Sequence, residues 1–403
     1  MVRDVRPEVA SGRYHGLCPL GSICFWRNGY GMLMPMLGER ERFMLLNLIP
    51  GIGSLRLRRL LEAFGDLDRL WRSSAEELQQ VEGIGPRLAH ELVAGFRNEA
   101  ALQQELAIAQ RSGVAMLTLA DPGYPKALRT IHDPPLALYL RGSLGLSDDV
   151  AVAIVGARRA SLYGVQTAER LGYDLALRGV TVVSGLARGI DAAAHRGALR
   201  AAGRTIAVLG SGVARLYPPE HADLAEQIVQ QGAVISEYPM EMPPLAQNFP
   251  RRNRVISGLS LGVVIVEAAQ RSGALITADC ALEQGREVFA VPGPVTSVTS
   301  QGTHQLLRQG ARLVSSVEDI VEELRLSPCA PEISAPQSGS CEDVALSESE
   351  ERLLACVGSE GRHVDVITTQ SGLSASEASS LLLQLELKHV VQQLPGKQFI
   401  RQR

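Results

Sequence analysis

The apolar residues in the middle of the chain fall into short runs that alternate with helical patterns. Runs typical of buried strands cover residues 150–155, 181–183, 205–209, 263–266 and 288–291. Between them, apolar residues recur at helical spacing over 163–178, 190–202, 220–231, 252–260 and 275–285. Strands that alternate with helices of about 10–15 residues are typical of βαβ units. The pattern therefore predicts an α/β, Rossmann-like domain over residues 150–325, with a doubly wound and mostly parallel sheet.

Two glycine hairpins indicate a separate helical domain over residues 38–105. Gly51 and Gly53 precede a helical pattern over 54–64, and Gly83 and Gly85 precede a second one. The pair predicts a helix-hairpin-helix, SAM-like domain. Main-chain N–H groups at the start of a helix can bind phosphate. The alternative, that these glycine turns serve only a compact helical fold, stays open.

The C-terminal residues 344–403 predict a third domain. Helical patterns cover 347–356, 364–370 and 374–387, and two short apolar runs then bracket a Pro-Gly-Lys turn. Three helices followed by a β-hairpin are typical of a winged helix. Its third helix enters the major groove of duplex DNA in many such domains. Here that helix contains serine, glutamate and glutamine but no arginine, so a protein-binding or regulatory role is at least as well supported.

The segments between these domains differ from them in composition. Residues 1–37 have no helical or strand period and contain Met32, Met34 and Met36. They are either a disordered extension or a mis-assigned start, and we favour the second interpretation. Residues 106–149 are interrupted by prolines and contain a short strand candidate at 136–140, which suggests a connector packed on the central domain. Residues 326–343 are rich in Pro and Ser and predict a flexible linker.

Charge and cysteine usage restrict the kinds of site to expect. The chain has 403 residues and a formal net charge of −3, so a nucleic-acid site must be a local patch. The cysteines form no CxxC pair and no zinc-like spacing, which indicates neither a disulfide framework nor a metal site. No apolar run reaches about 18 residues. We therefore expect a cytoplasmic protein with no membrane span, cofactor or metal.

Glycine and arginine gather where the predicted strands end. Glycines at helix starts expose main-chain N–H groups, and arginine forks bind phosphate in two places at once. Ligands of doubly wound sheets lie beyond the carboxyl ends of the strands, so these residues predict one anion-binding surface. They are Gly156, Arg158, Arg159, Ser184, Gly185, Arg188, Gly189, Gly210, Phe249, Arg251, Arg252, Asn253, Arg254, Arg271, Gly273 and Thr277.

Two common phosphate motifs are excluded. The segment that starts at Gly210 has Arg215 where a dinucleotide fingerprint needs its third glycine. No GxxxxGK[ST] sequence occurs, and the only lysines are Lys126, Lys388 and Lys397. The surface is therefore an arginine surface of another kind.

Several long motifs resemble the DprA/Smf family of DNA-processing proteins. They are Gly-Ala-Arg-Arg at 156–159, Ser-Gly-Leu-Ala-Arg-Gly-Ile-Asp at 184–191, Phe-Pro-Arg-Arg-Asn-Arg at 249–254, Ser-Gly-Ala-Leu-Ile-Thr at 272–277 and Val-Phe-Ala-Val-Pro-Gly at 288–293. The resemblance is near-continuous from about residue 120 to 322. The paired hairpins and the small C-terminal domain also resemble modules of that family.

The resemblance implies a homodimeric protein that binds and protects single-stranded DNA and helps load a RecA-type recombinase during natural transformation. It implies DNA contacts from Arg158, Arg159, Arg188, Arg251, Arg252 and Asn253, with Gly185, Gly189, Gly210 and Gly273 allowing the strand close to main-chain amides. Pro219, Glu220 and His221 depart from the family, where a basic residue or Asn commonly follows the Tyr-Pro pair. A DNA contact at that turn is therefore an open question.

A nucleotide hydrolase on a related scaffold, a phosphoribohydrolase, is the alternative. Its signature is a glycine- and threonine-rich turn before a catalytic glutamate, and the segment after Glu267 lacks that turn. Glu237 and Glu267 follow strands and could act as acids or bases. Asp191 and His195 lie four residues apart on one helical face, but no nucleophile accompanies them. A non-enzymatic binding protein is the better interpretation.

Overall fold

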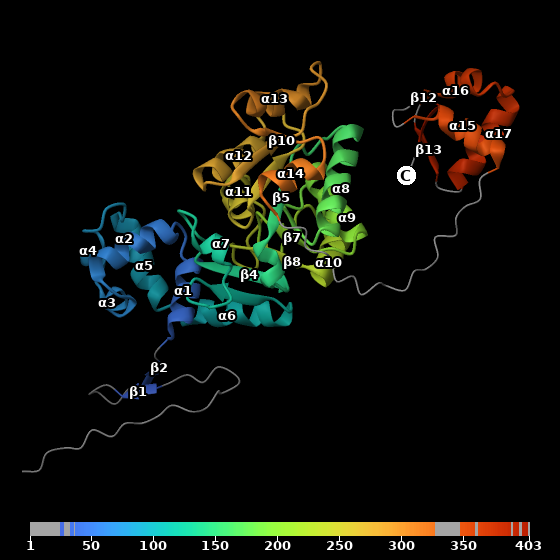
Figure 1. Ribbon diagram of the computed structural model, residues 1–403. Helices are drawn as coiled ribbons and strands as arrows, with labels where there is room; N and C mark the ends of the chain where they lie inside the picture. Colours follow the sequence, from blue (N-terminus) through green and yellow to red (C-terminus); the bar gives the residue numbers. More distant parts are fainter. Residues whose placement is uncertain are drawn as a thin grey trace, which may run out of the picture. The chain divides into compact units, whose positions relative to one another are not determined.

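The computed structural model describes residues 25–27, 33–35, 37–326, 347–358, 362–387, 390–394 and 397–401. The chain divides into two compact units, Met1–Pro331 and Glu332–Arg403 (Figure 1). Strands β1 (Phe25–Arg27) and β2 (Leu33–Pro35) pair antiparallel ahead of the first helix. The rest of the expected N-terminal extension and nearly all of the expected linker lie outside the described residues.

Six helices form the helix-hairpin-helix region. They are α1 (Glu39–Leu48), α2 (Ser54–Phe64), α3 (Leu67–Arg72), α4 (Ala75–Leu78), α5 (Pro86–Phe96) and α6 (Glu99–Arg111). Gly51 and Gly83 have φ of 82° and 86°, a backbone conformation that favours glycine and allows each hairpin to turn sharply into α2 and α5. Leu60, Leu70 and Leu92 are fully buried in its core.

A nine-stranded sheet forms the centre of the first unit, in the order β11-β10-β9-β5-β6-β7-β8-β4-β3. Neighbours from β11 to β8 are parallel, whereas β4 is antiparallel to both β8 and β3. The strands are β3 (Ala115–Thr118), β4 (Ala137–Gly142), β5 (Ala151–Val155), β6 (Thr181–Ser184), β7 (Thr205–Val208), β8 (Ala233–Ser236), β9 (Gly262–Ile265), β10 (Glu287–Ala290) and β11 (Arg312–Leu313).

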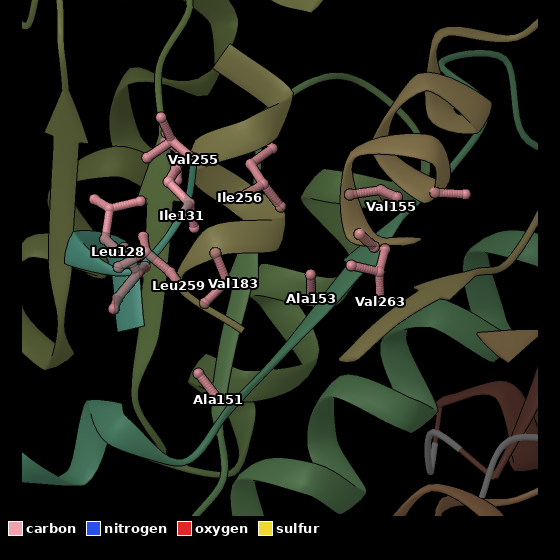
Figure 2. Packing of buried hydrophobic residues seen from close by; sticks show 14 of the residues in the cluster. Leu128, Ile131, Ala151, Ala153, Val155, Val183, Val255, Ile256, Leu259 and Val263 are labelled. Carbon is pink, nitrogen blue, oxygen red and sulfur yellow. The ribbon is translucent and has the colours of Figure 1, made fainter. Parts of the chain in front are cut away.

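Helices cover both faces of this sheet, because alternate strand residues point to opposite sides. Ala151 and Ala153 face one layer (Figure 2), whereas Val152 and Ile154 belong to the core on the other face. The first layer contains α7 (Lys126–Arg129), α11 (Asn248–Gly258), α12 (Gly273–Glu283) and α13 (Gln301–Arg308). The second contains α8 (Leu162–Leu177), α9 (Ile190–Arg200), α10 (Ala222–Gln231) and α14 (Val317–Glu323). Short 3-10 turns cover Leu146–Asp149, Pro219–His221 and Val298–Ser300. The α/β, doubly wound fold is confirmed.

Three details differ from the sequence prediction. In the segment expected to be a connector, β4 matches the strand candidate at 136–140, but β3 was not expected, and both strands belong to the sheet. Strand β8 was not expected between α10 and the arginine-rich segment. Helix α11 begins at Asn248, four residues before the predicted start, so Phe249, Arg251 and Arg252 lie in its first turns rather than in a loop.

The second unit is a winged helix, as predicted. Its helices are α15 (Glu348–Cys356), α16 (Val364–Ser371) and α17 (Ala375–Leu387). Strands β12 (Arg362–His363), β14 (Gln398–Arg401) and β13 (Val391–Leu394) form a three-stranded antiparallel sheet. Leu353, Ile367 and Leu385 are fully buried between the helices. Across the part of the chain that the structure describes, no helix is both long and apolar enough to cross a membrane.

Candidate nucleic-acid interface

A cavity of about 570 Å³ opens beyond the carboxyl ends of the central strands. Chain order reverses at β5, which has β6 on one side and β9 on the other, so the cavity lies at the switch point of the sheet. Eight of its lining residues are Gly156, Arg158, Phe249, Arg252, Asn253, Ser272, Gly273 and Thr277. All of these except Ser272 are predicted site residues. The structure therefore brings together seven predicted residues from three separate segments.

Three arginines at this rim are exposed. Arg158, which lines the cavity, and its neighbour Arg159 lie in the loop after β5, and Arg251 lies in the first turn of α11 between the lining residues Pro250 and Arg252. None of the three has a carboxylate within ion-pair distance among the described residues, and Arg271 in the loop after β9 is likewise exposed and unpaired there. These charges are available to an anionic ligand.

An aromatic ring accompanies the exposed charge. The Arg158 guanidinium lies over the Phe249 ring, with its Cζ 5.1 Å from the ring centroid, in a cation–π arrangement. The Tyr217 ring is tilted against Phe249 at 5.8 Å. Tyr238, a further aromatic residue near this segment, instead donates its hydroxyl to Asn248 O at 3.1 Å. Phe249 and Tyr217, which both line the cavity, provide surfaces on which a base can stack.

Arg252 differs from its neighbour Arg251 in being buried, with 4% of its surface exposed. Its Nη1 donates to Gly185 O at 2.9 Å and to Val208 O, and its Nε to Asn253 Oδ1 at 3.3 Å. Burial lowers the pKa of Arg252 to about 10, against the attraction of the Asp191 carboxylate. The side chain therefore joins the ends of β6 and β7 and forms part of the cavity wall.

Two other predicted contacts, Arg254 and Arg188, are held in ion pairs and do not line the cavity. Arg254 is largely buried and pairs with Glu237 and, at 3.3 Å, with Asp133. Arg188 is half-exposed and pairs with Glu220, in the turn where the sequence departs from the family. Sequence reasoning could not separate these residues from Arg158, because the acidic partners lie on other elements.

The predicted glycines also differ in their surroundings. Gly156 and Gly273 line the cavity; a Cβ on Gly273 would meet nothing within 4 Å, whereas one on Gly156 would lie 2.7 Å from Ile190 Cγ1 and 2.9 Å from Glu267 O. Gly189 has φ of 75°, and a Cβ there would lie 2.3 Å from Ala157 O in the first loop. A Cβ on Gly185 would meet the Arg252 guanidinium, and one on Gly210 would meet the Phe249 ring. These last three glycines are thus required by contacts within the protein itself.

Three other predicted polar residues are buried, and each has a defined place. Ser184 Oγ donates to Ile154 O at 2.6 Å, inside the sheet. Asn253 Nδ2 donates to Gly273 O at 3.1 Å and so fixes the start of α12 beside the cavity. Thr277 lies one turn further along α12 and lines the cavity. Asp191, Tyr217 and Ser272 also line the cavity and were not predicted as contacts, although each stands in or beside a quoted motif.

The candidate acids and bases all have partners within the protein. Glu267 accepts hydrogen bonds from Ser161 N, at 2.9 Å, and from Ser161 Oγ, and so supports the start of α8. Asp191 accepts from Gly185 N and Ala187 N, and burial raises its pKa. His195 Nδ1 lies 2.7 Å from Thr205 Oγ1, and burial lowers the pKa of His195 to about 3. Asp191 and His195 therefore have separate partners.

The first glycine hairpin is bound by the protein itself. Ser54 Oγ, at the start of α2, donates to Asp133 Oδ1 at 2.6 Å. A carboxylate therefore already lies at the helix start that could have bound a phosphate. Arg58 Nη2 donates to His132 O at 3.1 Å. At the second hairpin, Arg59 Nη1 donates to Glu82 O at 3.3 Å, whereas a Cβ on Gly85 would meet nothing within 4 Å.

Comparison with known proteins gives a consistent result along the chain. A family model described as DNA recombination-mediator protein A matches residues 115–325. A model of the DprA winged helix domain matches 341–397, and a helix-hairpin-helix motif matches 43–104.

Individual relatives resemble most of the chain. Protein Smf of Escherichia coli (strain K12) is 49% identical over 278 residues, which are 68% of this chain and 74% of that protein. Protein Smf of Synechocystis sp. is 34% identical and covers 90% of this chain and 99% of the relative. The X-ray structure of DNA processing protein A (DprA) from Streptococcus pneumoniae has a TM-score of 0.63 and 34% identity, and the match covers 72% of this chain and 99% of that chain.

Proposed function

The chain belongs to the DprA/Smf family of DNA-processing proteins, and on that premise we propose that the cavity rim of its central sheet binds single-stranded DNA. The observation that carries the proposal is the group of exposed, unpaired arginines, Arg158, Arg159 and Arg251, around a cavity that Phe249 also lines. Basic grooves with stacking surfaces are typical of proteins that bind single strands.

We assign separate roles to the predicted site residues. Arg158, Arg159 and Arg251 bind phosphates, and Phe249 stacks on a base. Gly156, Gly273 and Thr277 form the part of the wall that a strand can approach. Arg252, Asn253, Ser184, Gly185, Gly189 and Gly210 keep the loops in place, and Arg254 joins the sheet to Asp133.

Charge reversal tests this assignment. Arg158→Glu combined with Arg251→Glu removes two phosphate contacts, so affinity for an oligothymidylate should fall by about tenfold or more at low salt. The slope of log K against log salt should become shallower by about 1.4, since each contact contributes about 0.7 on a single strand. Arg111→Glu with Arg196→Glu is the matched control, because both arginines are exposed, neither line the cavity nor adjoin a lining residue in sequence, and change net charge equally. Equal affinities for the two double variants, both folded, would disprove the proposal.

The protein acts, in this proposal, by binding rather than by catalysis. Supporting this, Glu237, Glu267, Asp191 and His195 each have a structural partner. Incubation with AMP and related nucleotides should release no ribose phosphate. Release that is lost in Glu267→Gln would favour the hydrolase alternative.

We further propose that the protein is a cytoplasmic homodimer that transfers DNA to a RecA-type recombinase during natural transformation. The matched description of a recombination mediator supports this role. The test is the rate at which the recombinase nucleates on single-stranded DNA that a competing single-strand-binding protein has covered. Addition of the chain should increase that rate, and light scattering should give the mass of two chains.

The domain limits are also a proposal. We propose that residues 38–105, 150–325 and 344–403 form the helical, DNA-binding and winged-helix domains, with 106–149 belonging structurally to the second. The separate cores of the two compact units support the last boundary. Limited proteolysis should cut first between residues 326 and 343.

A further inference from the structure

The Arg188–Glu220 pair is distinctive among the charges at the cavity rim. Arg188 lies in the loop after β6, beside Ala187, which lines the cavity. Glu220 lies in the turn Pro219–His221 that precedes α10. The two side chains are 53% and 47% exposed, and they are joined through Arg188 Nε and Glu220 Oε1. Arg158, Arg159 and Arg251 have no such partner among the described residues.

The pair is positioned by buried neighbours. His221, adjacent to Glu220, is buried, and its Nδ1 lies 2.8 Å from Leu186 O. Leu186 is fully buried, has φ of 56° and lies two residues before Arg188. The turn that carries Glu220 is therefore fastened to the loop that carries Arg188. Most exposed ion pairs are free to separate, but here the backbone keeps the two groups adjacent.

The ion pair changes how available the Arg188 guanidinium is to an anionic ligand. The hydrogen bond from Arg188 lowers the pKa of Glu220, which means that the pairing stabilises the charged carboxylate. A carboxylate is the protein group that most resembles a phosphate in its hydrogen bonding to a guanidinium. Glu220 occupies the Nε of Arg188, so a DNA phosphate can bind both Nε and a neighbouring Nη of Arg188 only by displacing Glu220.

We propose that Glu220 is a built-in competitor of the DNA backbone for Arg188 and thereby limits the affinity of this chain for single-stranded DNA. The proposal rests on the proposed function of the cavity rim. Glu220 then lowers the affinity for DNA without contacting DNA itself. This would be the physical effect of the sequence departure from the family at Pro219, Glu220 and His221. Single-stranded DNA that is bound less tightly dissociates more readily and can be transferred to a recombinase.

The test is Glu220→Gln, which keeps the shape of the side chain and removes its charge. Affinity of the full chain for an oligothymidylate should rise by about two- to tenfold at low salt, and the salt slope should steepen by about 0.7, because one further phosphate is neutralised. Glu318→Gln is the matched control. Glu318 pairs with Arg178, is exposed, and lies at the opposite end of the sheet from the cavity, where β6 begins.

A double-mutant cycle separates local competition from the change in net charge. Arg188→Gln should cost more affinity in the Glu220→Gln background than in the wild-type chain. In the wild-type chain it should cost less than Arg158→Gln does. This second comparison needs no change at Glu220 and so tests the proposal even if Glu220→Gln folds poorly.

Several outcomes would overturn the proposal. Lower affinity in Glu220→Gln would mean that Glu220 orients Arg188 for DNA. Equal gains in Glu220→Gln and Glu318→Gln would assign the effect to net charge, and no gain would remove the competition altogether. If Arg158→Gln still weakens binding in these cases, only the role of Glu220 fails. If Arg158→Gln has no effect either, the proposed function fails with it.

Discussion

Arg251 and Arg252 are adjacent in the sequence but have opposite surroundings. Successive residues of a helix point about 100° apart, so once α11 begins at Asn248 one of the two side chains faces solvent and the other faces the sheet. The sequence predicts correctly that this segment contributes to the site. Which arginine is buried depends on where the helix begins, and the predicted start at residue 252 lies four residues after the observed one. Pro250 lies in the first turn of the helix, where proline is tolerated because it breaks no internal hydrogen bond.

Substitution of these two arginines should therefore affect different properties. Arg252→Ala removes the donors to Gly185 O and Val208 O and leaves the Asp191 carboxylate without its nearby charge. We expect a loss of about 3–5 kcal/mol in the free energy of unfolding, because two buried carbonyl oxygens lose their donor and a buried carboxylate loses its nearby positive charge. Arg251→Ala should leave unfolding within about 0.5 kcal/mol, since Arg251 is exposed, and should weaken DNA binding instead. Urea titration and fluorescence anisotropy of both variants provide the check. Equal stability of the two would contradict the buried role of Arg252.

His195 should make the protein sensitive to acid. It is fully buried, and its Nε2 has no hydrogen-bond partner within the described part of the chain. Burial lowers its pKa from 6.5 to about 3, so between these values the unfolded chain binds a proton that the folded chain does not. Stability from this group is complete above pH 6.5 and falls as pH decreases, by up to about 1.4 kcal/mol per pH unit.

The variant His195→Asn isolates this effect. Asparagine retains a donor near Thr205 Oγ1 but has no group that titrates in this range. The variant should be less stable at pH 7, and its unfolding free energy should decrease less steeply between about pH 6 and pH 4. Identical pH slopes for both proteins would assign the acid sensitivity to other groups.

At the scale of elements, prediction succeeded where one element had a clear pattern of its own. The helix over 54–64 and the five central strands lie within one or two residues of their predicted limits. Strand β8 (Ala233–Ser236) was missed because its four residues follow α10 with only Gly232 between them. Strand β4 pairs with β8 from almost a hundred residues away, and no local pattern specifies such a partner.

The contact between α8 and α9 depends on small residues. A Cβ on Gly197 would lie 2.0 Å from Glu169 O, and one on Gly172 would lie 2.4 Å from Ala194 O. Gly197→Ala should improve helix propensity by about 1 kcal/mol. The clash with backbone should outweigh this gain, so we expect a net loss of about 1–3 kcal/mol. The denaturation midpoint is the measurement, and Gly273→Ala is the control because a Cβ there meets nothing within 4 Å. A midpoint for Gly197→Ala at or above that of the wild type would contradict close helix packing.

At the scale of the whole molecule, the arrangement of charge matters more than its total. The chain has a slightly negative net charge of −3. Arg158, Arg159 and Arg251 nevertheless lie together at the cavity rim, and none forms an ion pair with a described residue. The sequence could predict this concentration but not which arginines are neutralised. The partners Asp133 and Glu237 reach Arg254 from distant segments, and pairing of that kind is set by the folded topology.

The winged helix should contribute little to binding of single strands. Helix α17 exposes Ser376, Ser379, Ser380 and Gln384 and has no arginine that could meet a phosphate. Deletion of residues 341–403 should therefore leave oligothymidylate affinity within about twofold, because phosphate contacts dominate such binding. The remaining chain contains the complete core of the first unit, so it should fold. Gel shifts with single- and double-stranded oligonucleotides, run on both lengths of protein, separate the contributions. A large loss of single-strand affinity would transfer the main site to the winged helix, whereas an unchanged preference for single strands would leave it at the arginine rim of the sheet.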